Sequence, residues 1–370
     1  MGFGLFVPEF RSAFAMSTSD VGFVSSLGFL GFFIGLLAAQ GLLDRLGPKV
    51  PVLSGLAAAT SGMATVALAP SLTVLALGVF LAAASAGFAW TPFNDAVHRK
   101  IRDVDRPTAL SEISTGTSVG IVLAGALALG TVFLNMDWRV CWTLFAVLAA
   151  FALFVNWTAL RRVEKATDDG HDRRWRSFRH RAAIAMFAVA FVYGTTSAIY
   201  ISFAADRFSN SGGVAGVPAQ ATPGLVFVFY GLFGFSGLFA GRVKSRIGLP
   251  WLLRLLLAAG ALSAAFVALL PDSWLGLIGS AGLQGVNVMM TSAVLAFWSE
   301  RMFPALPSLS FTAALLATAA GSVVGPALAG LVSDAFGGGA MFLGTAALPA
   351  VAAVVLRSRH CQEQPVTSAP

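Results

Sequence analysis

The chain has 370 residues, of which 57% are hydrophobic and only 11% are charged, with a mean hydropathy of +0.80. Soluble domains carry about 25% charged residues, so this composition excludes a cytosolic enzyme, a nucleic-acid-binding domain and a secreted disulfide scaffold. The formal net charge of +7 therefore needs an explanation other than binding to nucleic acid.

The first hydrophobic segment, Met1 to Phe14, is too short to cross a membrane. At 1.5 Å per residue it covers roughly 20 Å, whereas the hydrocarbon core of a bilayer is ~30 Å thick. We interpret it as the outer half of a first helix that is truncated at its N-terminus, as a start codon placed too far downstream would produce. The alternative is a first helix that is simply short.

Long windows without Asp, Glu, Lys or Arg mark the other membrane spans. The window from Val50 to Asn94 is long enough for two crossings, and Pro70 interrupts it near the middle. Together with the first segment, the windows predict twelve helices, eleven of them complete. The complete helices are expected at 21–43, 50–69, 72–97, 108–134, 139–160, 182–206, 223–241, 250–270, 273–298, 308–333 and 340–356.

The basic residues gather on one side of the predicted membrane. If the loop after the second helix is cytoplasmic, 21 of the 24 Lys and Arg residues lie inside, and only Arg11, Arg139 and Arg207 lie outside. The positive-inside rule produces this asymmetry, and contact with anionic lipid headgroups accounts for the net charge. We therefore expect a multi-pass protein of the cell (inner) membrane, with cytoplasmic N- and C-termini and no nucleic-acid partner.

An internal repeat with a constant offset of 201 residues divides the chain into two halves. Gln40–Gly47 aligns with Gly241–Gly248, and the same offset places Pro70 on Pro271. Two six-helix halves related by an axis along the membrane normal are a transporter architecture. The predicted domains are an N-terminal bundle at 1–160 (helix 1 incomplete, helices 2–6), a cytoplasmic central loop at 161–181, a C-terminal bundle at 182–356 (helices 7–12) and a cytoplasmic tail at 357–370.

The segment after the second helix resembles a family signature. The signature G-x-L-x-D-R-x-G-R-R/K lies between helices 2 and 3 of the major facilitator superfamily, and this chain matches it at Leu42, Asp44, Arg45, Gly47 and Lys49. It departs from the signature at Gln40 and Pro48. The resemblance covers essentially the whole chain and implies an all-α integral membrane fold of two six-helix bundles with a pseudo-twofold repeat. It is nearly silent on the substrate.

The same segment is the candidate inner gate. Gly47 suits a tight turn, Asp44 suits a helix N-terminus, and Arg45 or Lys49 would pair with an acid on a neighbouring helix, for which the candidate is Asp95. The resemblance implies that these residues, with Arg246 and Gly248 of the second copy, form a latch that holds the outward-facing state. The alternative is a positive-inside turn that only fixes the topology.

Polar side chains near mid-depth predict the solute cavity. Two helices carry polar stripes with helical spacing. One stripe consists of Tyr193, Thr196, Ser197 and Tyr200, and the other of Gln284, Asn287 and Thr291. By analogy with the family, both helices line the central cavity. Ser85 and Trp90 on the helix at 72–97 are further candidates. The alternative role for the polar groups is hydrogen bonding between helices, and for Trp90 it is packing.

Ionisable groups are scarce inside the predicted membrane, and none lies at mid-depth of a complete helix. Glu112, about one turn into its helix, is the candidate carrier of a coupled proton, because burial would favour its neutral form. The alternative is an interfacial pair with Arg102 or Arg106.

The sequence offers no sign of catalysis or of a cofactor. All four His residues lie in predicted inner loops or the tail, so none can bind a metal ion or haem at mid-depth, and no nucleotide-binding G-x-x-x-x-G-K-[ST] motif occurs. We expect a monomeric secondary active transporter that moves a small neutral or weakly charged organic solute by alternating access, with proton coupling left open. The alternative is a non-transporting membrane sensor, or a degenerate transporter on the same fold.

Overall fold

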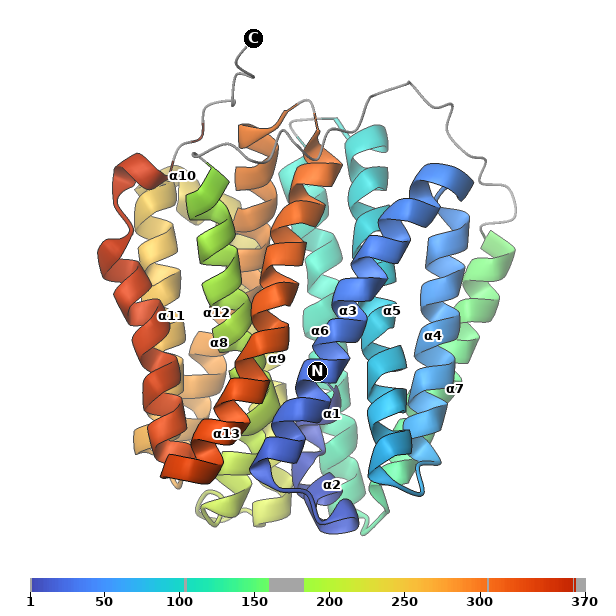
Figure 1. Ribbon diagram of the computed structural model, residues 1–370, viewed down its shortest axis with the longest axis vertical. Coiled ribbons are helices and arrows are strands. Elements are labelled where there is room, and N and C mark those ends of the chain that lie inside the picture. The colour runs from blue at the N-terminus through green and yellow to red at the C-terminus, as the bar shows by residue number, and fades with distance from the viewer. Residues whose placement is uncertain (1, 103–104, 160–182, 305, 362, 364–370) are drawn as a thin grey trace.

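The computed structural model describes residues 2–102, 105–159, 183–304, 306–361 and 363. Nearly all of these residues are helical, and none of them is in a strand. The helices run roughly parallel to the long axis of the molecule, which stands vertical in Figure 1. The predicted central loop at 161–181 lies outside the described residues.

The N-terminal half begins with two short helices and continues with five long ones. These are α1 (Gly2–Leu5) and α2 (Val7–Phe14), followed by α3 (Thr18–Leu46), α4 (Lys49–Ala67), α5 (Leu72–Lys100), α6 (Arg106–Phe133) and α7 (Trp138–Ala159). A capping box starts α3, because the Ser17 hydroxyl accepts from the Asp20 N–H and the Asp20 carboxylate accepts from the Ser17 N–H.

The C-terminal half supplies six crossings. Its helices are α8 (Ala183–Asn210), α9 (Thr222–Gly234), α10 (Ala240–Ile247), α11 (Leu249–Leu269), α12 (Trp274–Met302) and α13 (Pro307–Val355). The 3₁₀ segment η4 (Phe235–Phe239) joins α9 to α10, so the three form one crossing. Gly337 has non-helical angles inside α13 (φ 84°, ψ 160°) and divides it into two crossings. Among the described residues, ten helical stretches are long and apolar enough to span a membrane.

The helix boundaries repeat with the offset that the sequence predicts. Adding 201 to Leu46, the last residue of α3, gives Ile247, the last residue of α10. The turns that follow use glycine in the left-handed region, with φ of 77° at Gly47 and 79° at Gly248. The duplicated twelve-helix architecture is therefore confirmed, including the tight turn expected at Gly47.

The two halves meet along helices that approach closely through glycine. A Cβ atom on Gly125 of α6 would lie 2.8 Å from the carbonyl oxygen of Gly224 in α9, and one on Gly22 of α3 would lie 2.4 Å from that of Pro326 in α13. Small residues allow such backbone contact in membranes, where dispersion forces rather than hydrophobic burial hold helices together. Gly125 and Gly22 therefore allow the close contacts of α6 with α9 and of α3 with α13.

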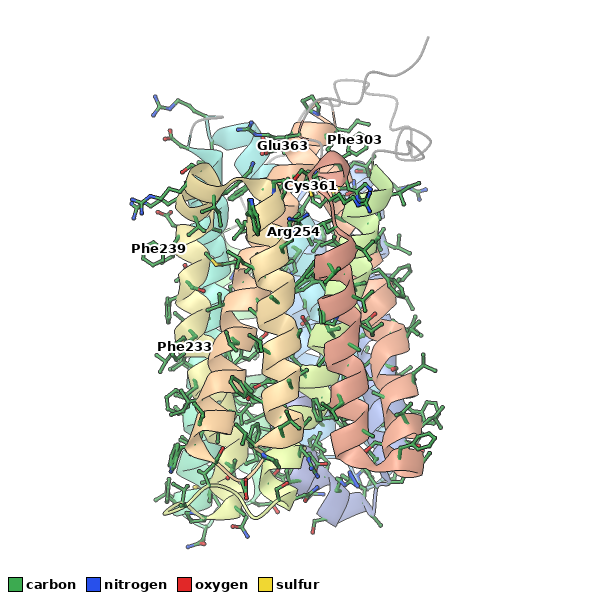
Figure 2. The ribbon with its side chains drawn as sticks, turned by 90° about the vertical axis from the view of Figure 1, so that its left-hand side faces the viewer. Phe233, Phe239, Arg254, Phe303, Cys361 and Glu363 are labelled. Carbon is green, nitrogen blue, oxygen red and sulfur yellow. The ribbon has the colours of Figure 1, made fainter. Side chains whose placement is uncertain are left out.

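The outer surface of the bundle is apolar, as contact with lipid requires. Phe151 and Phe154 of α7 are 65% and 69% exposed. Figure 2 shows Phe233 and Phe239 projecting outward from the side of the C-terminal half. These exposures identify a lipid-facing surface rather than a defect in the core.

The two ends of the bundle differ in character. The upper end in Figure 1 carries the α3–α4 and α10–α11 turns, and the lower end carries α2 and the α4–α5 turn. The described part of the tail contacts the C-terminal half, where Lys244 forms an ion pair with Glu363. The sequence analysis expects the upper end inside and the lower end outside.

Candidate functional site

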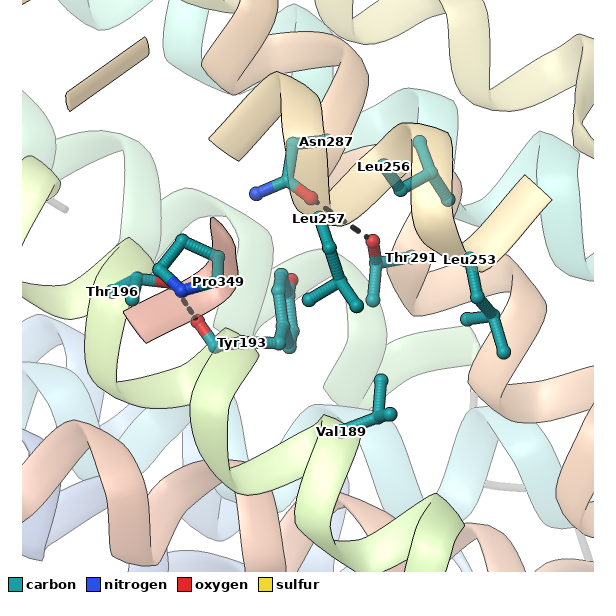
Figure 3. Close-up of a pocket in the computed structure, with 9 residues that line it drawn as sticks. All are labelled: Val189, Tyr193, Thr196, Leu253, Leu256, Leu257, Asn287, Thr291 and Pro349. Atoms are coloured by element: carbon teal, nitrogen blue, oxygen red, sulfur yellow. Dashed lines mark hydrogen bonds between the residues drawn. The ribbon is translucent and has the colours of Figure 1, made fainter. Parts of the chain in front are cut away.

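A pocket lies inside the C-terminal half between α8, α11, α12 and the last part of α13. Its lining is drawn in Figure 3: Val189, Tyr193, Thr196, Leu253, Leu256, Leu257, Asn287, Thr291 and Pro349. At its centre there is room for a molecule about the size of water. The structure thus brings Tyr193, Thr196, Asn287 and Thr291, predicted from two separate helices, to one site.

The polar groups of the pocket are held by hydrogen bonds. Tyr193 OH donates to the Val288 carbonyl oxygen at 3.2 Å, and Thr291 Oγ1 donates to Asn287 Oδ1 at 3.2 Å. Thr196 Oγ1 donates to the Val192 carbonyl oxygen at 3.0 Å. The Asn287 amide lies against Gly260 of α11, where a Cβ atom would be 2.9 Å from Nδ2. The observed position of the Asn287 amide therefore requires a residue without a side chain at Gly260.

All three tyrosines of the chain meet beside this pocket. The rings of Tyr200 and Tyr230 lie 6.4 Å apart in an edge-to-face arrangement, and the hydroxyls of Tyr200 and Ser280 are 3.1 Å apart. Tyr230 comes from α9, whereas Tyr193 and Tyr200 come from α8. We call Tyr193, Ser197, Tyr200, Tyr230 and Gln284 the tyrosine cluster.

Three buried polar atoms of the tyrosine cluster have no hydrogen-bond partner among the described residues. They are Tyr230 OH, Ser197 Oγ and Gln284 Nε2. Leaving such a group unsatisfied costs ~1–3 kcal/mol, so each of these atoms is a position at which a hydrogen bond from outside the protein would be favourable. Water or a polar solute would supply these bonds.

The tyrosine cluster adjoins the interface between the halves. A Cβ atom on Gly234, one turn after Tyr230, would lie 2.7 Å from Ser118 Oγ of α6 in the N-terminal half. Ser118 Oγ is also buried without a partner in the described part of the chain. Sequence reasoning identified Ser197 but missed Tyr230 and Ser118, although Tyr230 could have been singled out as one of only three tyrosines.

The other predicted cavity residues lie elsewhere. The Ser85 hydroxyl donates to the Ala82 carbonyl oxygen at 2.6 Å, within α5. Trp90 packs on Phe311 of α13, with ring centroids 6.4 Å apart, and so contributes to the contact between the halves. Neither residue reaches the pocket of Figure 3.

The candidate inner gate is partly described. Gln40 Nε2 donates to Asp44 Oδ1 at 3.0 Å, so the residue that departs from the family signature becomes a partner of the signature aspartate. Arg45 is exposed, and Lys49 is the first residue of α4. Arg246 and Gly248 lie at the corresponding turn of the second half. The side chain of Asp95 is outside the described part, so its predicted pairing stays a prediction.

Glu112, the candidate proton carrier, is exposed on α6. Its predicted role depends on burial favouring the neutral carboxyl. The role of Glu112 therefore stays a prediction.

Comparisons with known proteins agree with this architecture. Residues 1–226 match the family described as Major Facilitator Superfamily. A mutant of the nucleoside transporter NupG is similar in structure, with a TM-score of 0.75 at 15% identity over 96% of each chain. A bacterial homologue of the human lysosomal transporter Spinster, inward-facing and unoccupied, gives a TM-score of 0.74 at 17% identity, covering 95% of this chain and 91% of that one. No curated protein matches. The family match over more than half of the sequence, with the shared fold, shows that the chain belongs to the major facilitator superfamily.

Proposed function

We propose that the protein is a secondary active transporter, rather than an enzyme, that carries a small neutral or weakly charged organic solute by alternating access. The observation that supports this most is the tyrosine cluster, in which Tyr230 OH, Ser197 Oγ and Gln284 Nε2 have no hydrogen-bond partner among the described residues, and which adjoins the interface between the halves near Gly234. Transporters of this architecture bind solute near mid-depth where the two repeats meet.

The chemistry of the site favours an uncharged solute with a ring. None of the described residues that line the pocket carries a charge, so a fully ionised solute would lose its hydration without gaining a partner. The hydroxyls and amide of the tyrosine cluster offer hydrogen bonds, and the tyrosine rings offer stacking. A nucleoside, the solute named for the similar NupG structure, belongs to this chemical class and is a suitable first test compound.

The moving parts are the halves at 1–160 and 182–356, joined by the loop at 161–181. In this conformation the lower end is closed by contacts between the halves, because the Ala327 N–H donates to Ser26 Oγ at 2.9 Å and the Ser19 N–H donates to Asp334 Oδ2 at 3.0 Å. The glycine turn with Asp44, Arg45 and Lys49 would latch the upper end when the lower end opens. We place the protein in the cell (inner) membrane as a monomer.

Uptake into liposomes tests the proposal. Purified protein should take up labelled nucleoside or another neutral ring-containing solute, and Gln284→Ala combined with Asn287→Ala should abolish the flux. Ser85→Ala is the matched control, because it removes a hydroxyl that bonds only within its own helix. Binding of solute without flux would contradict transport and support a sensor on the same fold.

A further inference from the structure

A buried charge cluster joins the two halves at the lower end of the bundle. Arg11 Nη1 of α2 lies 3.1 Å from Asp206 Oδ2 of α8. The same guanidinium donates to Thr18 Oγ1 at the start of α3, at 3.3 Å from Nη1 and 3.2 Å from Nη2. Asp206 is only 5% exposed. The ion pair is therefore part of the closed contact between the halves.

The cluster contains one carboxyl more than its cation can neutralise. Glu9 lies on α2, two residues before Arg11, and interacts electrostatically with Asp206 and with the thiol of Cys141 in α7. Within the described part of the chain, Glu9 Oε2 and Asp206 Oδ1 are buried and have no hydrogen-bond partner. Two ionised carboxylates would thus share a single guanidinium, whose side chain is 25% exposed, while one oxygen of each carboxylate is shielded from water.

The other charged groups at this end do not compensate for Glu9, whose electrostatic partner is Asp206. Arg139 of α7 pairs with Asp137 and donates to the Ala69 carbonyl oxygen, Asp20 caps α3 through Ser17, and Asp334 of α13 accepts from Ser19. Arg207 of α8 lies against Gly338 and Gly339, and its Nε has no hydrogen-bond partner among the described residues. Burying an uncompensated charge costs far more than neutralising it, so the closed arrangement favours a proton on one of the two carboxyls. Asp206 has the direct contact with Arg11, which leaves Glu9 as the neutral acid.

We propose that Glu9 is a proton-binding site that closes the lower end of the transporter. With the end closed, Glu9 is neutral and the Arg11–Asp206 pair joins the halves. When the end opens, the pair separates, water hydrates both carboxyls, and Glu9 releases its proton to the solution on that side. The inference rests on the proposed alternating access, because a gate needs an end that opens.

The direction of the pH effect follows from proton counting. The closed state binds one proton more than the open state, so a low pH favours closure and a rising pH favours opening. Within the range where Glu9 is protonated only in the closed state, the closed-to-open ratio should fall about tenfold per pH unit. Outside that range the ratio should be independent of pH.

Spin labels at Ser71 and Asp272 test the proposal in the full chain in lipid nanodiscs, with Cys141→Ala and Cys361→Ala as background. These positions are exposed, lie at the lower end and are related by the 201-residue repeat. The wild-type distance should shift toward the open population as pH rises, and Glu9→Gln should stay closed throughout. Asp137→Asn, an exposed acid at the same end, should titrate like the wild type.

Two outcomes would overturn the gate. One is a wild-type distance distribution that does not change with pH. This result would contradict the proposal for Glu9 even if the Glu9→Gln protein fails to fold. The other is a Glu9→Gln protein that titrates like the wild type. Gly22→Ala separates this failure from failure of alternating access, because it should open the lower end at every pH. A distance that neither Gly22→Ala nor pH changes would contradict the transport proposal itself.

Discussion

The contact of Gly22 with Pro326 tests how the two halves close on each other. A Cβ atom on Gly22 would lie 2.4 Å from the Pro326 carbonyl oxygen and 3.3 Å from the Gly330 Cα atom. Both neighbours are backbone atoms of α13, so neither can move aside by changing a rotamer. Gly22→Ala must therefore push α3 away from α13 at the lower end.

The size of the effect follows from the cost of overpacking. Inserting one methyl group into a packed contact costs ~1–3 kcal/mol. Because α3 and α13 separate when the lower end opens, the cost falls on the closed state alone. The closed-to-open ratio should drop by about 5- to 150-fold.

The distance between labels at Ser71 and Asp272 measures this ratio. Gly62→Ala is the matched control, because its Cβ atom would lie 2.3 Å from the Ala82 amide nitrogen, within the N-terminal half. That clash is present in both states, so it should lower the unfolding temperature and leave the distance unchanged. The reasoning is refuted if Gly22→Ala leaves the distance unchanged, or if Gly62→Ala shifts it equally.

Two further predictions concern single polar groups. Tyr230→Phe removes a buried hydroxyl that has no hydrogen-bond partner among the described residues, which relieves an unfavourable free energy of up to ~1–3 kcal/mol. The substitution should therefore maintain or raise the unfolding temperature while it reduces liposome uptake. A fall in both the unfolding temperature and the uptake would indicate a structural role. Burial raises the pKa of the Cys361 thiol to about 11, and Figure 2 places this residue beside Phe303 and Arg254. Maleimide reacts with the thiolate, so labelling of Cys361, followed by mass spectrometry, should be slow at neutral pH and should accelerate as the pH approaches the pKa of the thiol. Rapid labelling at neutral pH would contradict the burial of Cys361.

The architecture could be predicted from the sequence because a bilayer restricts what a chain can do. A crossing needs a long apolar helix, so charge-free windows located the spans, and the helix expected at 72–97 is observed as Leu72–Lys100. The details within a span could not be predicted. The single helix expected at 223–241 is interrupted by the 3₁₀ segment Phe235–Phe239. The two helices expected at 308–333 and 340–356 run together as α13 and are separated only by the non-helical backbone angles of Gly337.

The candidate site could be predicted only in part. Helical spacing placed Tyr193 with Thr196, and Asn287 with Thr291, on shared faces, and the structure joins these faces in one pocket. Spacing along one helix cannot reveal which side chain of another helix lies opposite, which is why Tyr230 was missed. The pairing of Arg11 with Asp206 was missed for the same reason, since 195 residues separate them. The role of each site residue stays a prediction.

The glycine contact between α6 and α9 has a mechanical consequence. Gly125 packs on the Gly224 carbonyl oxygen, and Gly231 packs on Ser118 and Val122, so the two backbones approach closely along this contact. If α6 and α9 stay in contact while the halves rock, a covalent tether between these two helices should permit the whole transport cycle. The same tether between α3 and α13 should stop the cycle, because those helices separate when the lower end opens.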